Sequence, residues 1–431
     1  MLSKVLWVGL SARFLLVLKA ISFMNHCDVA IVGAGAAGLG AATRLAAAGR
    51  SVVLLEARDR LGGRAHTVLS RDGAPIDLGC EWLHSADRNP LVPLFESKGL
   101  EVDRTRPRWD EQEGNRGFTK AEQVEFAAAF DAFDDRLEAA SKNATDGPAS
   151  AYLEPGCRWN GLIDAISSYY NGTEFERVSV FDYGRYVDTG ENWRLPGGYG
   201  AALVSLAKGL SYRLNVRVLA IEDRLGGSVL RTSAGDLEVR HVVVTLPTAI
   251  LAQGELKLPS RYAAKIEAAA GLPLGLANKA FLNLGNPEPF SEEGHLFGRI
   301  DRAATGSYNL RPFGRPLIEA FFGGRHAAAL ETEGPGAMTA FALEELRGLY
   351  GSDIVKTITP DCETHWGQET FSRGSYSHAL PGHAEARRIL AERLDDRIAW
   401  AGEATHESAF STAHGAWETG LRAAEEILSL G

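Results

Sequence analysis

The stretch "CDVAIVGAGAAGLGAATRLAAAGR", from Cys27 to Arg50, decides the fold of this chain. Its apolar residues Val29 to Val32 predict a short buried strand, and the alanine-rich run after them predicts a helix that ends at Gly49. Three glycines between strand and helix give the spacing G-x-G-x-x-G: Gly33, Gly35 and Gly38. A strand, a glycine-rich turn and a helix in this order predict a Rossmann-like α/β domain that binds a dinucleotide.

Each glycine of the turn has a separate physical reason. Gly33 permits the tight turn, Gly35 lets the backbone approach a pyrophosphate, and Gly38 lets the helix pack closely on the strand. Ala37 lies in the same turn and is assigned to the cofactor site with them.

The next predicted strand, Val52 to Leu55, ends in Glu56. In dinucleotide-binding domains, the carboxylate that binds the ribose hydroxyls follows the last glycine by roughly 20 residues. Glu56 lies close to this spacing. A structural carboxylate at a strand end is the alternative reading. Because strand, turn, helix and strand all occur in order, we favour dinucleotide binding.

A second cluster of glycines and arginines, "EARDRLGGRAHT", begins at Glu56. Arg58 and Arg64 can neutralise a pyrophosphate, and Gly62 and Gly63 allow the backbone to approach it. A nicotinamide-binding domain has no need of this second cluster. The combination resembles the FAD signature of the flavin amine oxidase superfamily, which implies FAD as the cofactor.

The resemblance continues along the chain from about Asp28 to Leu430. The segments that carry it, in chain order, are "IDLGCEWLHSADRNPL", "RLPGGYGAALVSLAKGL", "VRVLAIE" with "VVVTLP", "ANKAFLNL", "WGQETFSRGSYSHALPG" and the closing "GEATHESAFSTAHGAWETGLRAA". The second of these differs from the family pattern by one residue in spacing. Because the motifs are specific and in order, the chain is identified as a member of this superfamily.

A chain of 431 residues is too long for one core, and the resemblance implies two domains. A Rossmann-like FAD domain is expected from segments 25–86, 195–260 and 386–431. A substrate domain of sheet and helices is expected from segments 87–194 and 261–385. The active site should lie between the two domains.

The closing stretch has small residues at the start of its helix. By resemblance, Ser411, Thr412 and Ala413 cap a helix whose N-terminus faces the flavin and stabilises the negative charge of its reduced form. Glu403 is expected at the ribityl or pyrophosphate region. The same resemblance adds to the cofactor site Gly79, Val218, Trp366 and Gly402.

Lys279, in "LANKAFLNL", matches the lysine that holds a water against flavin N5 in this family. A lysine in an alternating strand usually points to solvent. If it is partly buried, we expect a depressed pKa that suits proton transfer. Tyr376 matches one wall of the aromatic cage of monoamine oxidases, in which the preceding residue is a cysteine bonded to FAD. Ser375 stands there instead, so the FAD should be non-covalent.

Thr412 occupies the place of the second cage tyrosine of monoamine oxidases, so half of the cage is absent. The wording "GEATH...STAHGA" resembles spermine and acetylpolyamine oxidases. "EWLHS" resembles their "WIHG", although serine replaces the glycine, which makes His84 the counterpart of their active-site histidine. Trp82 is expected to line the substrate site with His84 and Tyr376.

The resemblance therefore predicts an FAD-dependent oxidase of amines, with a polyamine favoured and H₂O₂ as a product. A monoamine or L-amino-acid oxidase and a non-oxidase flavoprotein desaturase are the alternatives. The carboxylates that would hold distal ammonium groups are candidates by location only: Glu81, Asp182, Asp188 and Glu191.

Composition limits the partners. The net charge of -10 argues against nucleic acid, and eleven scattered histidines show no metal-ligand spacing. Four separated cysteines favour a cytoplasmic setting. Residues 1–24 are apolar but interrupted by Arg13 and Lys19, so we expect a leader or over-extended start rather than a stable membrane span, with targeting elsewhere as the alternative. The oligomeric state is left open.

Overall fold

The computed structural model describes residues 26–143 and 145–430. The leader expected at residues 1–24 lies outside these ranges. Within them, no helix combines the length and the apolar character that crossing a bilayer requires.

The first sheet has seven strands in the order β5-β2-β1-β8-β7-β6, with β14 paired to β8. They are β1 (His26–Val32), β2 (Val52–Leu55), β5 (Tyr212–Arg213), β6 (Val218–Arg224), β7 (Gly227–Thr232), β8 (Gly235–Val244) and β14 (Ile398–Trp400). β1 lies parallel to β2 and β8, whereas β6, β7 and β8 are antiparallel neighbours. The two strands predicted around the glycine turn are confirmed as β2 and part of β1, and α2 (Ala36–Ala47) follows the turn.

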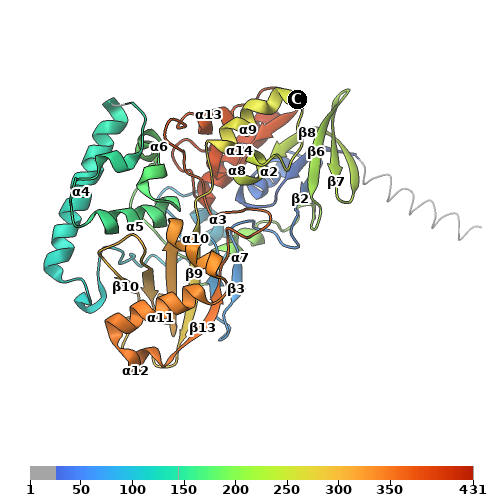
Figure 1. Cartoon of the computed structure of the whole chain (residues 1–431). Coiled ribbons are helices and arrows are strands. Elements are labelled where there is room, and N and C mark those ends of the chain that lie inside the picture. The colour runs from blue at the N-terminus through green and yellow to red at the C-terminus, as the bar shows by residue number, and fades with distance from the viewer. Residues whose placement is uncertain (1–25, 144, 431) are drawn as a thin grey trace, which may run out of the picture.

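Helices cover both faces of this sheet (Figure 1). Val29 and Ile31 of β1 join one apolar cluster, and Ala30 and Val32 join the other, because successive side chains of a strand point to opposite faces. The first cluster includes residues of α2, α3 (Leu91–Ser97), α7 (Tyr199–Ser205) and α14 (Ala413–Leu428). The second includes residues of α8 (Thr248–Ala252), α9 (Ala263–Ala270) and α13 (Ala386–Ala391). Such double burial is typical of a doubly wound α/β domain.

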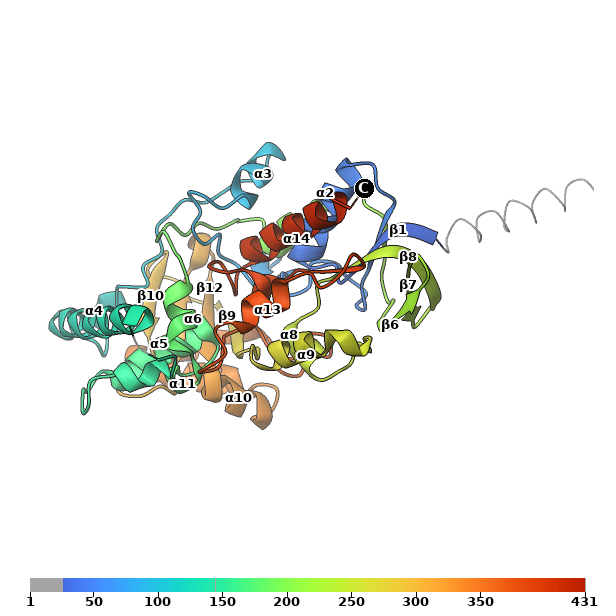
Figure 2. The same cartoon turned by 90° about the horizontal axis from the view of Figure 1, so that it is seen from above.

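The last helix, α14, packs directly on α2 (Figure 2). Glycines on both helices make the close approach possible. A Cβ atom on Gly420 would lie 2.1 Å from the Ala37 carbonyl oxygen, and one on Gly40 would lie 2.7 Å from the Trp417 carbonyl oxygen. The C-terminal helix is thereby fixed beside the glycine turn that opens the chain.

The second sheet is antiparallel, in the order β10-β11-β12-β9-β13. Its strands are β9 (Ala277–Leu284), β10 (Gly294–Phe297), β11 (Ser307–Leu310), β12 (Leu317–Gly323) and β13 (Ile358–Glu363). The helices around it are α4 (Lys120–Asn143), α5 (Asn160–Asn171), α6 (Val180–Arg185), α10 (Gly324–Glu333), α11 (Ala337–Tyr350) and α12 (Ser352–Val355) (Figure 1). A short hairpin, β3 (Thr67–Leu69) with β4 (Pro75–Asp77), follows the arginine-glycine cluster.

This architecture has the expected α/β form, with a Rossmann-like part and a part of sheet and helices. The described strands of the first sheet lie in segments 25–86, 195–260 and 386–431, and those of the second lie in segment 261–385. Helices α3 and α9 fall in the other segments but pack on the first sheet's clusters. The domain boundaries themselves stay predictions.

Candidate active site

The glycine turn forms a cradle that side chains cannot enter. Gly33 has a φ of +104°, and a Cβ atom there would lie 2.6 Å from Thr245 Oγ1. A Cβ atom on Gly38 would lie 2.0 Å from the Gly33 carbonyl oxygen. Gly35 pairs with Gly62 as an isolated bridge, which brings the second glycine cluster against the first. Bare backbone of this kind suits the close approach of a phosphate group.

Glu56 lies buried at the end of β2 and also fixes the turn. Its carboxylate accepts hydrogen bonds from the backbone N–H of Ala34 (2.9 Å) and of Arg58 (3.0 Å). Its carbonyl oxygen accepts from the N–H of Val216 (2.9 Å), so the segment that leads to Val218, the buried first residue of β6, lies beside it. A structural role for Glu56 is thus evident, and its contact with ribose stays a prediction.

Three sequence motifs meet at Glu403. Its carboxylate accepts from Arg64 Nη1 (3.0 Å), Ser377 Oγ (2.6 Å) and the N–H of Ser411 (3.0 Å). Burial would raise the pKa of Glu403, but Arg64 and Arg387 hold it below its ordinary value. Arg58, by contrast, pairs with Glu369, to which its Nε donates at 3.2 Å.

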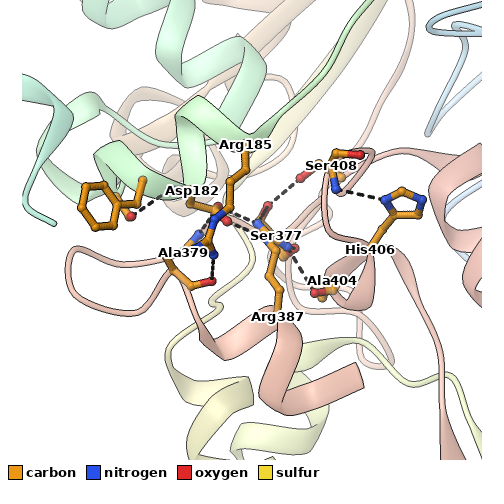
Figure 3. Close-up of polar contacts among 12 residues, drawn as sticks. Asp182, Arg185, Ser377, Ala379, Arg387, Ala404, His406 and Ser408 are labelled. Atoms are coloured by element: carbon orange, nitrogen blue, oxygen red, sulfur yellow. Dashed lines mark hydrogen bonds and ion pairs between the residues drawn. The ribbon is translucent and has the colours of Figure 1, made fainter. Parts of the chain in front are cut away.

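Arg387 links this cluster to the second part of the molecule (Figure 3). Its guanidinium binds both carboxylate oxygens of Asp182, at 2.6 and 2.8 Å, and also Ser377 Oγ at 2.9 Å. The N–H of Ala379 donates to the same aspartate at 3.0 Å. Asp182 is therefore occupied by protein groups and is not a free carboxylate for a substrate ammonium group.

A small cavity beside Glu403 contains polar atoms without partners. Arg64, Thr248, Trp400 and Gly402 are among the residues that line it. Within the described ranges, Thr248 Oγ1 and Trp400 Nε1 are buried and form no hydrogen bond. Buried polar groups normally have partners, so unpartnered ones point to a polar ligand. With the glycine cradle nearby in the fold, these residues fit a dinucleotide cofactor.

The start of α14 forms the predicted helix cap, and its orientation towards the flavin stays a prediction. Thr412 is the N-cap residue: its Oγ1 accepts from the N–H of Gly415 (3.0 Å) and donates to the Ala409 carbonyl oxygen (2.6 Å). Ser411 has a φ of +64°, in the left-handed region. A Cβ atom on Gly415 would lie 1.9 Å from the Ala409 oxygen, so small residues are needed here for the chain's own packing.

Lys279 is buried on β9 and contacts three acceptors. Its Nζ lies 2.9 Å from Glu81 Oε2, 2.8 Å from Glu319 Oε1 and 3.0 Å from the Asp77 carbonyl oxygen. Burial alone would lower its pKa, but Glu319 and Glu81 raise the pKa above the ordinary value of a lysine. The expected depressed pKa is wrong, because the sequence did not reveal that two carboxylates would lie beside this ammonium group.

The loop after β4 is held from both sides. Trp366 Nε1 donates to the Leu78 carbonyl oxygen (2.9 Å), and the N–H of Trp366 donates to Asn278 Oδ1 (2.9 Å). A Cβ atom on Gly79 would lie 1.7 Å from the Arg64 carbonyl oxygen. The loop is thus fixed between two of the predicted motifs, and it places Glu81 against Lys279.

His84 has a defined tautomer. Asn192 donates through Nδ2 to the Gly190 carbonyl oxygen (3.1 Å), so its Oδ1 faces His84 Nδ1 at 2.6 Å. The His84 proton must then lie on Nδ1, which leaves Nε2 as an acceptor. Burial also lowers the pKa of His84. The residue is therefore a neutral imidazole near neutral pH.

Aromatic side chains surround the other predicted substrate residues. Trp82 packs edge-on against Trp109 at 4.6 Å between ring centroids, and the Arg194 guanidinium lies 4.7 Å from the Trp82 ring. Tyr376 is fixed by a hydrogen bond from its hydroxyl to the Tyr169 carbonyl oxygen. Their contacts with an amine substrate stay predictions.

Four residues of this region escaped the sequence analysis: Trp109, Asn192, Glu319 and Arg387. Only Glu319 carried a signal, as a single charge in the apolar run "LIEAFFGG".

Two of the acidic residues predicted as candidates for binding distal ammonium groups, Asp188 and Glu191, are exposed. Asp188 Oδ1 accepts from Ser85 Oγ (3.2 Å) and the N–H of Gly190 (2.9 Å).

A family model for flavin containing amine oxidoreductase matches residues 36–428. The chain belongs to this family. It is therefore a flavin-dependent amine oxidase, as the sequence motifs predicted.

Among the relatives of this amine oxidase, polyamine oxidase 3 of Oryza sativa subsp. japonica is 30% identical over 93% of this chain and 89% of its own length. A lysine-specific histone demethylase 1 homolog 3 of Oryza sativa subsp. indica is 31% identical over 94% of this chain, but only 54% of its own length. The structure of putrescine oxidase bound to putrescine matches with a TM-score of 0.73 at 20% identity, covering 94% of this chain and 99% of that one. This likeness supports the fold alone.

Proposed function

We propose that the protein is an FAD-dependent oxidase of polyamines that binds FAD without a covalent bond. FAD, held by the glycine turn with Glu56, Arg64 and Glu403, would supply the acceptor for a hydride from the carbon next to a neutral amine nitrogen, and O₂ would receive the electrons as H₂O₂. Water then converts the imine into an aldehyde and a smaller amine. The chain's own residues bind, orient and tune these partners.

The convergence of three motifs on three consecutive residues carries the proposal. Lys279 Nζ bonds to the carbonyl of Asp77, Trp366 Nε1 bonds to the carbonyl of Leu78, and Gly79 packs against the carbonyl of Arg64. The sequence resemblance assigned each of these motifs to the flavin site independently.

The contacts of Ser375 support non-covalent binding. Its Oγ accepts from the N–H of Ala277 (2.9 Å) and donates to the carbonyl of the same residue (2.8 Å). The side chain is therefore tied to β9, and a hydroxyl in this position has no thiolate chemistry for a bond to the flavin. After denaturation we expect FAD in the supernatant, and flavin retained on the precipitated chain would contradict the assignment.

Arg194 is not available to bind the carboxylate of an amino-acid substrate. An amino-acid oxidase needs a cation to bind the substrate carboxylate. Arg194 is buried and already pairs with Glu293, with Asp103 (3.3 Å) and with Glu81 (3.9 Å). The neutral His84, with Nε2 as acceptor, instead suits the N–H of an amine. The polyamine oxidases among the relatives, matched over nearly their full length, favour polyamines within the amines.

A peroxide assay across an amine panel tests the proposal. The panel should contain spermine, N-acetylspermine, putrescine, an arylalkyl monoamine, an N-methylated lysine peptide and L-amino acids. We expect the highest kcat/KM with a polyamine. Preference for the monoamine, the peptide or an amino acid would overturn the polyamine assignment while leaving the amine oxidase family unaffected.

A further inference from the structure

Lys279 lies between two carboxylates that belong to different elements. Glu81 lies on the loop after β4, and Glu319 lies on β12, the neighbour of β9 in the second sheet. The exposed fractions are 5% for Lys279, 8% for Glu81 and 4% for Glu319, so water screens none of these charges effectively. An ammonium group has three N–H donors, and Lys279 has three acceptors within 3.0 Å. The contacts with Asp77 and Glu81 are hydrogen bonds, and Glu319 forms an ion pair with the same ammonium group.

The local charges do not balance if both glutamates are ionised. One ammonium group would face two buried carboxylates, and an uncompensated buried charge is costly. Arg194 lies 3.9 Å from Glu81, but it also pairs with Asp103 and Glu293. The favourable solution is one proton shared by the two glutamates.

The electrostatics indicate which glutamate holds the proton. Burial and the neighbouring Glu81 raise the pKa of Glu319. Burial also acts to raise the pKa of Glu81, but Lys279 and Arg194 outweigh it and lower that pKa. The other ionisable groups that face this trio are Asp77, Cys80, Arg194, Arg315 and Tyr376.

The carboxylate of Asp77 does not bind Lys279, because it points to other partners. It accepts from Thr67 Oγ1 (2.5 Å) and from the N–H groups of Tyr199 (2.7 Å) and Gly200 (3.1 Å). Only its carbonyl oxygen meets Lys279.

We propose that Glu81 and Glu319 are positioning residues that share one proton and hold Lys279 as a permanently charged, immobile ammonium group. The proposal rests on the function proposed above for the site beside the flavin. Lys279 then acts as a fixed cation, and the exchangeable proton of the site lies on the carboxyl group of Glu319. A neutral trio at neutral pH becomes singly negative when that proton leaves at alkaline pH.

Paired amide substitutions in the FAD-loaded protein test the proposal. Glu319→Gln keeps a neutral, hydrogen-bonding group of the same shape, so it should slow amine-driven flavin reduction by at most about tenfold and should remove the alkaline transition from the pH profile of that rate. Glu81→Gln removes the anion that Lys279 and Arg194 both face, and should slow reduction about a hundredfold by displacing the lysine. Glu345→Gln is the matched control, since Glu345 is also buried but bonds to Thr305, Gly306 and Tyr308.

Infrared spectroscopy supplies a readout that does not depend on turnover. The difference between wild type and Glu319→Gln should contain the carbonyl stretch of a protonated carboxyl group at neutral pH, and in wild type this band should vanish at alkaline pH. Absence of the band, or equal losses of rate in both variants, would overturn the proposal. If Glu319→Gln does not fold, the pH titration of the wild-type band decides. If no amine reduces the flavin, the proposed function fails. The infrared result still shows whether the carboxyl group of Glu319 holds the proton.

Discussion

Two buried ion-pair clusters connect the Rossmann-like part to the rest of the molecule, and they differ in charge balance. Around Arg387, two cations (Arg64 and Arg387) meet two carboxylates (Asp182 and Glu403), and every carboxylate oxygen has a donor. Around Lys279, one ammonium group meets Glu81 and Glu319. A balanced cluster suits a scaffold, whereas an excess carboxylate keeps a proton that can be exchanged. Burial of charge alone therefore does not distinguish structure from chemistry.

The largest expected effect comes from breaking the balanced cluster. Arg387→Met leaves Asp182 buried without its cation, which should cost about 3–5 kcal/mol of unfolding free energy. Urea denaturation of the FAD-loaded protein measures this loss. Arg185→Met is the control, because Arg185 pairs with Glu385 at an exposed position and should change stability by less than about 1 kcal/mol. Equal losses in the two variants would mean that the Arg387 cluster is not the scaffold we describe.

Removing the cation of the unbalanced cluster should affect turnover more than stability. Lys279→Met should slow flavin reduction or reoxidation by about 10²–10⁴-fold with FAD still bound. The protein should stay folded, because Glu81 and Glu319 can each take up a proton once the ammonium group is gone. Stopped-flow traces separate the two half-reactions.

Lys265→Met is the matched control for Lys279→Met. Lys265 is also buried, but its ammonium group bonds to the carbonyls of Ile389, Leu390 and Glu392 on the first sheet's side. Its loss should lower the midpoint of thermal unfolding and leave both half-reactions within about threefold. A Lys279→Met variant that behaves like this control would make Lys279 a structural residue.

The His84–Asn192 pair should show a smaller effect with a defined pH dependence. Asn192→Leu removes the acceptor that holds the proton on Nδ1, which should lower kcat/KM about tenfold. Burial lowers the pKa of His84, so the imidazole is neutral at and above its ordinary pKa and gains a proton only at lower pH. In wild type, protonation of His84 should therefore lower kcat/KM only as the pH falls below about 6.5. A His84-dependent transition above that pH would contradict the lowered pKa of His84.

A feature of the fold or of the site could be predicted from the sequence when the residues that form it lie close together in the chain. The turn at Gly33 and the cap at Thr412 follow from residues close in sequence, and both are confirmed. The pKa direction of Lys279 could not be predicted, because Glu81 and Glu319 come from distant segments. Asn192 beside His84 gave no signal either, since an asparagine in a loop has many ordinary uses.

The smallest expected effect is at Thr412. Two substitutions there distinguish a helix-capping role from a contact with the substrate. The cap uses only the hydroxyl, which both accepts from Gly415 and donates to Ala409. Thr412→Ala should therefore cost about 1 kcal/mol of unfolding free energy, and Thr412→Ser should restore most of it. A wall of the substrate site would depend on the methyl group, so both variants would then raise the KM for the amine equally while differing in stability. We expect stability to follow the hydroxyl and KM to stay within about twofold in Thr412→Ser. If KM rises in the serine variant, the methyl group contacts the amine and Thr412 is a substrate residue as well as a cap.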